Sequence, residues 1–202
     1  MKLSHVAALA LLAMAPALAS ASAFTVDFEH PWNYASDVNG YYAGGTADDG
    51  TSGVNLGVSF VNVSGLSNDA DFTYYSGAPS PLGTAYAHDA AFINVGAGVY
   101  GNLSFFYSTP VAVTGAIKAY SGLNGTGTLL GTFDLGANSS ESYDTWSSVT
   151  LRFDGVAQSF DLSGSDYAVG FDNISTVPEA ASTVMMLAGV GLLAGLARRR
   201  RV

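Results

Sequence analysis

Residues 111–135 read VAVTGAIKAYSGLNGTGTLLGTFDL and contain two runs of β-branched and aromatic residues separated by a turn. The runs, 111–120 and 128–135, have the length and composition of β-strands, and neither shows the periodicity of a helix. Asn124-Gly125 between them is typical of a tight hairpin turn, because both residue types tolerate a positive φ. This stretch therefore predicts an antiparallel β-hairpin.

The same pattern of short apolar runs and turn residues extends over residues 24–177, which hold all but three of the 24 glycines. Many short strands at this spacing predict an all-β fold of two packed antiparallel sheets, a β-sandwich or jelly roll. Residues 35–55 and 65–89 are rich in Gly, Pro and polar residues and are expected to form long surface loops. Further strands are expected at 24–29, 56–61, 92–95, 102–107, 146–153, 157–162 and 167–174, with hairpin turns at Asp154-Gly155 and Ser163-Gly164.

The first 23 residues have the pattern of an export signal. Lys2 supplies a positive charge, residues 6–18 are mostly apolar, and Ala21-Ser22-Ala23 offers the small residues that signal peptidase recognises. A cut after Ala21 is the alternative to a cut after Ala23. We therefore expect a signal helix that is removed on export.

A second apolar segment covers residues 180–197 and contains no charge. Eighteen helical residues span about 27 Å, close to the thickness of a hydrocarbon core of about 30 Å. Four arginines follow at 198–201, and moving several guanidinium groups across a bilayer is costly. The segment is therefore predicted to be a transmembrane helix that holds the arginines in the cytoplasm and residues 24–177 outside.

The order of Val177-Pro178-Glu179, an apolar helix and an arginine cluster resembles the PEP-CTERM sorting signal over residues 178–202. The resemblance implies a temporary anchor in the inner membrane that a transpeptidase, exosortase, recognises at a Pro-Glu-Pro element and processes. Ala180 stands where the second proline of that element usually stands. A permanent single-pass anchor is the alternative. Sorting and processing are thereby assigned to Val177, Pro178, Glu179, Ala180, Arg198, Arg199, Arg200 and Arg201.

Three phrases of the middle region also resemble exported domains that precede such a tail. They are Tyr42-x-Gly44-Gly45, residues 120–127 (YSGLNGTG) and Phe171-Asp172-Asn173-Ile174. This resemblance implies a jelly roll like that of carbohydrate-binding modules and a role in the extracellular matrix. In such modules an acid of the first strand and an Asp of the last strand share a structural calcium, and the matching residues are Glu29 and Asp172.

Charge and composition exclude several kinds of chemistry. The whole chain has a net charge of −9, and residues 24–177 carry 15 acidic residues against Lys118 and Arg152, a net −13. This balance argues against nucleic acid and anionic membrane surfaces as partners.

Cysteine is absent, which excludes disulfides, thiol nucleophiles and Cys-ligated metals. With two histidines, His30 and His88, in residues 24–177 and no Gly-x-Ser-x-Gly motif, no catalytic residues are assigned.

Planar aromatic side chains can stack on sugar rings, and several lie in the predicted loops or beside them. Exposed aromatics of this kind are candidates for a glycan-binding surface, although the core of a sandwich also consumes Phe and Tyr. The candidates are Trp32, Tyr41, Tyr42, Tyr74 and Tyr75.

The sequence therefore predicts an exported, non-enzymatic protein that acts at the cell surface or in an exopolysaccharide matrix. Signal peptidase and an exosortase-like transpeptidase are the expected partners during export. Two alternatives stay open: a carbohydrate-binding module that uses the loop tyrosines and a structural calcium, and a secreted glycan-active hydrolase with paired carboxylates.

Overall fold

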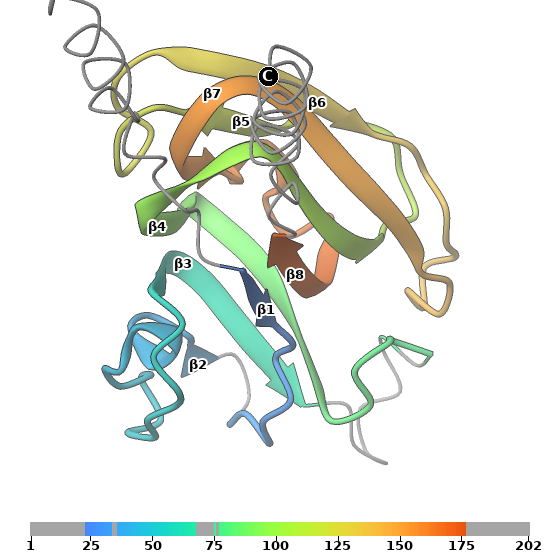
Figure 1. Ribbon diagram of the computed structural model, residues 1–202. Helices are drawn as coiled ribbons and strands as arrows, with labels where there is room; N and C mark the ends of the chain where they lie inside the picture. Colours follow the sequence, from blue (N-terminus) through green and yellow to red (C-terminus); the bar gives the residue numbers. More distant parts are fainter. Residues whose placement is uncertain (1–22, 34–35, 68–74, 76, 177–202) are drawn as a thin grey trace, which may run out of the picture.

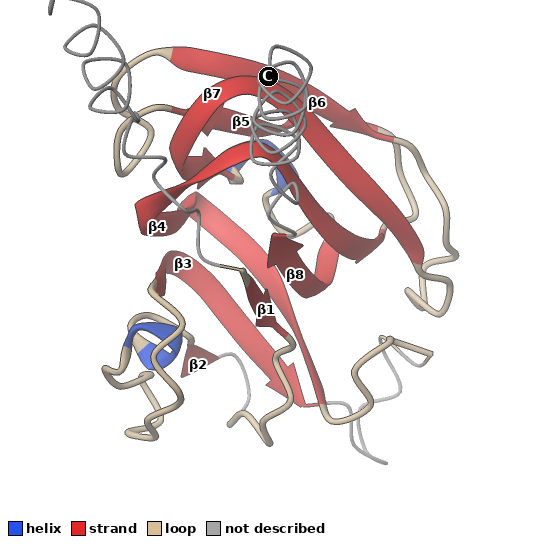
Figure 2. Ribbon diagram, viewed as in Figure 1, coloured by secondary structure: helices blue, strands red, loops and turns tan. Residues whose placement is uncertain are grey.

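The computed structural model describes residues 23–33, 36–67, 75 and 77–176, and strands dominate these residues (Figure 2). Two short 3₁₀ helices, η2 (Tyr41–Ala43) and η3 (Ser163–Ser165), are the helical elements of the described part. The prediction of an antiparallel all-β fold is confirmed. The strands are β1 (Phe24–Val26), β2 (Ser36–Asp37), β3 (Val58–Ser67), β4 (Gly83–Ser108), β5 (Val113–Tyr120), β6 (Leu129–Leu135), β7 (Ser147–Asp161) and β8 (Gly170–Thr176).

The predicted hairpin is present as β5 and β6, which pair antiparallel with Ile117 opposite Phe133. Asn124 and Gly125 have φ values of 52° and 70°, the backbone that a tight turn of this kind requires. Asn94 of β4 anchors the turn: its Nδ2 donates to Asn124 Oδ1 at 2.7 Å and its Oδ1 accepts the Asn124 N–H at 2.8 Å. The hairpin is thus attached to the rest of the sheet by side chains as well as by strand pairing.

Strand β4 is 26 residues long and joins segments that the sequence predicts as separate strands. Phe171 of β8 pairs with Ala85 near the start of β4 and also with Tyr107 near its end. One residue can have a different partner on each edge, so β4 must lie along both edges of β8. The bend this requires is accommodated at Gly98 and Gly101, whose φ values of 78° and 74° favour glycine.

The sheet is folded into two layers (Figure 1). One layer holds β2, β3 and the first part of β4, and the other holds β5, β6 and β7, with β4 passing from one layer to the other. A single cluster of buried apolar side chains fills the space between them. Burying a side chain of this size stabilises the fold by about 1.5–3 kcal/mol each. The largest fully buried side chains of the cluster are those of Phe28, Phe160, Phe171, Ile93, Leu103, Ile117, Leu162 and Ile174.

Both predicted long loops contain more regular structure than expected. In the region 35–55, the Val38 N–H donates to Val63 O at 2.9 Å, so β2 is held against β3, and η2 follows. In the region 65–89, β4 begins at Gly83, because small buried residues such as Ala85 and Ala87 fit between neighbouring strands. Pairing to distant strands, rather than local composition, decides these segments.

The two remaining turn predictions are wrong. Asp154-Gly155 lies inside β7, where it forms part of a bulge, because β4 continues to pair on either side of it. Ser163-Gly164 does lie in the connection between β7 and β8, where it begins η3, but β4 lies between these two strands in the sheet and no hairpin forms.

The first and last strands of the domain lie side by side. β1 pairs with β8, with Phe24 opposite Thr176 and Val26 opposite Ile174. The predicted signal helix and C-terminal transmembrane helix fall outside the described residues. Within the described residues, no helix has both the length and the apolar character needed to span a membrane.

Candidate functional site

The residues assigned to processing lie at or beyond the limits of the described structure. Ala23 is described and exposed, one residue before β1. Ala21 and the sorting residues, Val177, Pro178, Glu179, Ala180 and Arg198 to Arg201, fall outside the described residues, as does Tyr74.

Glu29 and Asp172 are brought to the same end of the β1–β8 pair, since Val26 and Ile174 are register partners. Asp172 is fully buried, and its two carboxylate oxygens accept the backbone N–H groups of Ser80 and Asn173, each at 2.7 Å. Glu29 Oε1 accepts the Leu82 N–H at 2.8 Å. Burial raises the pKa of Asp172 to about 7, with the nearby charge of Glu29 adding to the increase.

Glu29 and Asp172 supply the negative charge that a hard cation needs. Their carboxylate oxygens make up only a small part of a coordination shell. Calcium takes six to eight oxygen ligands. Within the described residues, no group of three or more His, Cys, Asp or Glu side chains is gathered to hold a metal. A cation at this place would therefore take oxygens of Glu29 and Asp172 together with backbone or solvent oxygens.

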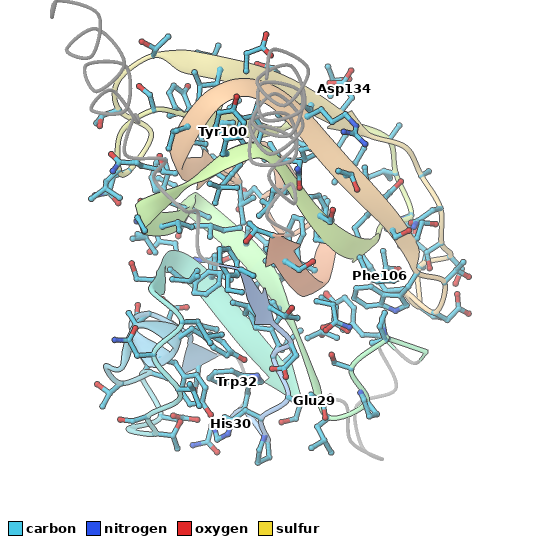
Figure 3. All side chains as sticks on the ribbon, in the orientation of Figure 1. Glu29, His30, Trp32, Tyr100, Phe106 and Asp134 are labelled. Atoms are coloured by element: carbon cyan, nitrogen blue, oxygen red, sulfur yellow. The ribbon has the colours of Figure 1, made fainter. Side chains whose placement is uncertain are left out.

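Trp32, Tyr41 and Tyr42 form an aromatic cluster with His30 rather than an exposed surface. The Trp32 ring lies 4.6 Å from His30 and 5.1 Å from Tyr41 (ring centroids; Trp32 and His30 are labelled in Figure 3). Trp32 and Tyr42 are buried, and Trp32 Nε1 donates to Phe28 O at 3.0 Å. The expectation that these two rings face solvent is wrong, because Trp32 packs over Gly65 of β3 and Tyr42 packs edge-on against Phe60 of β3.

The loop that carries Tyr41 is held by hydrogen bonds around a buried carboxylate. His30 Nε2 lies 3.3 Å from Asp49 Oδ2 and 3.1 Å from Thr51 Oγ1. Burial alone would raise the pKa of Asp49, but hydrogen bonds from Thr51 and His30 outweigh it and lower that pKa. Thr51 Oγ1 also donates to Asp49 Oδ1, so His30, Asp49 and Thr51 together fix this loop.

Tyr75 lies in a second aromatic cluster whose other members the sequence does not single out. Its ring centroid is 5.0 Å from Tyr143 and 6.1 Å from Trp146. All three side chains are partly exposed. Trp146 Nε1 is buried and has no acceptor among the described residues. Buried indole N–H groups normally have a hydrogen-bond partner. This cluster therefore combines partly exposed rings with a buried N–H donor that has no acceptor among the described residues.

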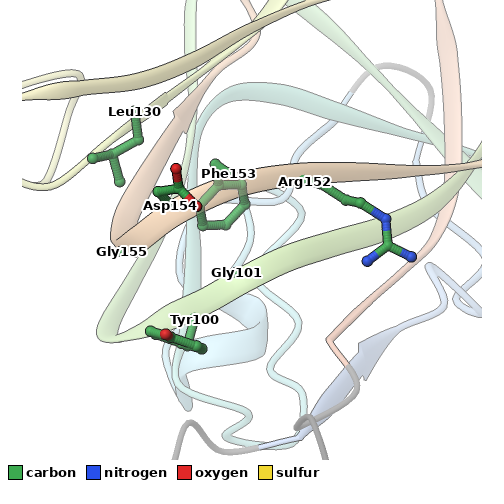
Figure 4. Close-up of a pocket in the computed structure, with 7 residues that line it drawn as sticks. All are labelled: Tyr100, Gly101, Leu130, Arg152, Phe153, Asp154 and Gly155. Atoms are coloured by element: carbon green, nitrogen blue, oxygen red, sulfur yellow. The ribbon is translucent and has the colours of Figure 1, made fainter.

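A groove of about 440 Å³ lies on the other layer, along the bulge of β4 and β7 (Figure 4). Tyr100, Arg152 and Asp154 line it, and all three are exposed. Figure 3 shows Tyr100 well separated from Trp32 and His30. The sequence does not predict this groove, because Asp154-Gly155 has the residue types of a hairpin turn. Arg152, one of two basic residues in 24–177, is the residue that could have indicated a site here.

The C-terminal residues match a known family model. Residues 176–201 match the PEP-CTERM protein-sorting motif. The resemblance drawn from Val177-Pro178-Glu179 and the arginine cluster is therefore confirmed. The chain is an exported protein that carries this C-terminal sorting signal. No curated protein matches the chain in sequence.

Several solved structures are similar to the β domain in overall architecture. CBM35 from Paenibacillus barcinonensis is 17% identical, with 60% of this chain and 94% of that chain covered and a TM-score of 0.40. CsCBM6-3 from Clostridium stercorarium, in complex with cellobiose, is 23% identical, with 57% and 83% covered and a TM-score of 0.38. A glycoside hydrolase family 43 arabinoxylan arabinofuranohydrolase from Bacillus subtilis is 16% identical, with 52% of this chain and 24% of that chain covered and a TM-score of 0.38.

Proposed function

We propose that this protein is exported and held briefly in the inner membrane by its C-terminal helix. An exosortase-type transpeptidase then releases it to the cell surface or the exopolysaccharide matrix. There it acts without catalysis. The sorting motif at residues 176–201 carries the proposal. The structure supports the proposal because the motif begins at Thr176, the last residue of β8. The recognition element thus follows a folded domain with no intervening linker.

The intact mass of the surface-released protein tests this proposal. The expected product begins at residue 22 or 24 and ends near Pro178. A variant with Glu179→Ala removes the acidic residue of the recognition element and should accumulate as the membrane-bound form, while Glu141→Ala, a change at an exposed acid of the domain, serves as the matched control. A released protein that still extends through Val202 would refute processing.

Carbohydrate binding is the second candidate function, and the cluster of Tyr75, Tyr143 and Trp146 favours it. Partly exposed rings offer faces to the C–H side of a sugar. Retention on insoluble polysaccharide should be reduced by Tyr143→Ala and by Trp146→Ala, because each removes a partly exposed ring of the cluster. Retention that equals the parent's in both variants would remove this cluster from the proposal.

A structural calcium at Glu29 and Asp172 belongs to the same candidate function. Burial is the main cause of the raised pKa of Asp172, and the charge of Glu29 adds to it; a divalent cation beside the two carboxylates would favour their ionised forms. The cation would act on the stability of the fold, because Asp172 is buried beside the core and not exposed to a substrate.

A further inference from the structure

The groove on β4 and β7 is formed by an irregularity of the sheet. Tyr100 pairs with Val156 and Asn102 pairs with Arg152. One residue, Gly101, therefore lies opposite three residues of β7. Bulges of this kind redirect side chains and are frequent beside binding sites.

Glycines keep the groove open. Gly101 and Gly155 have φ values of 74° and 96°. A Cβ atom built on Gly101 would meet nothing within 4 Å, and one on Gly155 would meet only Leu130 Cδ2, at 3.9 Å. The space above the bulge is therefore open to an incoming molecule. Figure 4 shows the residues that line it.

The groove offers three chemically distinct groups on neighbouring strands. Tyr100 is 58% exposed, so that most of its surface is available for stacking. Arg152 supplies only hydrogen-bond donors and Asp154 supplies only acceptors. A ligand that has apolar C–H faces and hydroxyl groups that both donate and accept matches all three.

We propose that this groove is a binding site for a neutral polysaccharide, with a sugar ring stacked on Tyr100 and its hydroxyl groups bonded to Arg152 and Asp154. A volume of about 440 Å³ lies within the range of small-molecule binding sites, about 300–1,000 Å³. The site is separate from the Tyr75 cluster and does not depend on the sorting proposal.

Charge decides between neutral and anionic polymers. Asp154 lies in the groove itself, and residues 24–177 carry a net charge of −13. An anionic chain would gain one contact with Arg152 and be repelled by the rest of the domain. A neutral chain avoids this repulsion, so its binding should change little with ionic strength.

Affinity gel electrophoresis of the exported domain tests the proposal, with laminarin and hydroxyethylcellulose as neutral probes and alginate as the anionic probe. At least one neutral polymer should retard the protein. Tyr100→Ala and Arg152→Gln should each weaken that retardation about tenfold or more, while Tyr100→Phe should preserve it. Tyr167→Ala is the matched control, because Tyr167 is also exposed, at 61%, and lies outside the groove.

The outcomes are distinct because each variant is first checked for an unchanged melting temperature. Retardation by neither neutral polymer, or by alginate alone, would overturn the proposal. So would equal loss of binding in Tyr100→Ala and Tyr167→Ala. If binding is lost in Tyr143→Ala but not in Tyr100→Ala, the groove is excluded and the Tyr75 cluster is supported instead.

Discussion

The carboxylate of Asp172 accepts the backbone N–H of Ser80 at 2.7 Å, although 92 residues separate the two in sequence. Burial raises the pKa of Asp172 from 3.8 to about 7. The folded protein therefore binds this proton more tightly than the unfolded chain does, and the free energy of unfolding should fall as pH rises from about 4 to about 7. The expected loss is on the order of 3 kcal/mol. Urea unfolding across this pH range measures it.

The matched variants for this prediction are Asp172→Asn and Asp154→Asn. The first should flatten the pH dependence between pH 4 and pH 7, because the titrating group is gone. The second replaces an exposed carboxylate and should leave the profile unchanged. A profile for Asp172→Asn that matches the parent's would contradict the assignment of the titration to this residue.

Calcium should raise the melting temperature if it binds at Glu29 and Asp172. At a free concentration about 100-fold above Kd the increase in stability would be about 2.7 kcal/mol. The increase should disappear on adding EDTA and in Glu29→Gln, while magnesium at the same concentration should have a smaller effect. A melting temperature unaffected by calcium and by EDTA would exclude the site.

His88 should contribute a second, separate pH dependence. Its Nε2 lies 2.9 Å from Asp37 Oδ1 and its Nδ1 lies 3.3 Å from Asp89 Oδ2. Burial alone would lower the pKa of His88, but the hydrogen bonds to these carboxylates raise it above the usual value. The stabilisation is therefore fully present below about pH 6.5 and is lost as pH rises through the raised pKa. After screening by solvent it should be less than about 1 kcal/mol, and His88→Gln should remove it.

Gly53 should tolerate no side chain. A Cβ atom at this position would lie 2.2 Å from Tyr41 Cε1, and the Tyr41 ring is packed against His30, Trp32 and Tyr42. Gly53→Ala should therefore destabilise the fold by about 1–3 kcal/mol, measured by chemical unfolding. Gly96→Ala, where a Cβ would meet nothing within 4 Å, should change the stability by less than about 0.5 kcal/mol. Equal effects at the two positions would contradict the packing of Tyr41.

Asn94 should be needed to attach the β5–β6 hairpin. Asn94→Ala leaves the Asn124 N–H without its acceptor and should cost about 1–3 kcal/mol. Hydrogen exchange at Asn124 should increase more than exchange at Leu103, a fully buried residue of β4. Unchanged exchange at Asn124 would show that the turn is held without Asn94, by strand pairing and by the hydrogen bonds of Ser159 Oγ to Gly125 N–H and Gly122 O.

Local chemistry made some of this structure predictable. Asn124-Gly125 forms the turn that its residue types favour, because a tight turn depends on the φ values of two adjacent residues. The Asp154-Gly155 pair has similar chemistry but lies in a bulge. Its conformation depends on the pairing of β7 with β4, which is distant in sequence. The burial of Trp32 and Tyr42, the joining of two predicted strands into β4 and the opening of the groove likewise depend on residues far along the chain.

The proposed anchoring through residues 176–201 has a mechanical consequence for β8. The sorting motif begins at Thr176, so any pull transmitted from the membrane enters the domain through β8. That strand is hydrogen-bonded to both parts of β4 and to β1, which spreads the load over several strands in shear. Among the described strands β8 is the last to be synthesised, and a chain in which it has not yet inserted would leave edges of β4 and β1 unpaired. On the proposed anchoring, the strand that completes the sheet is also the strand through which the domain is attached.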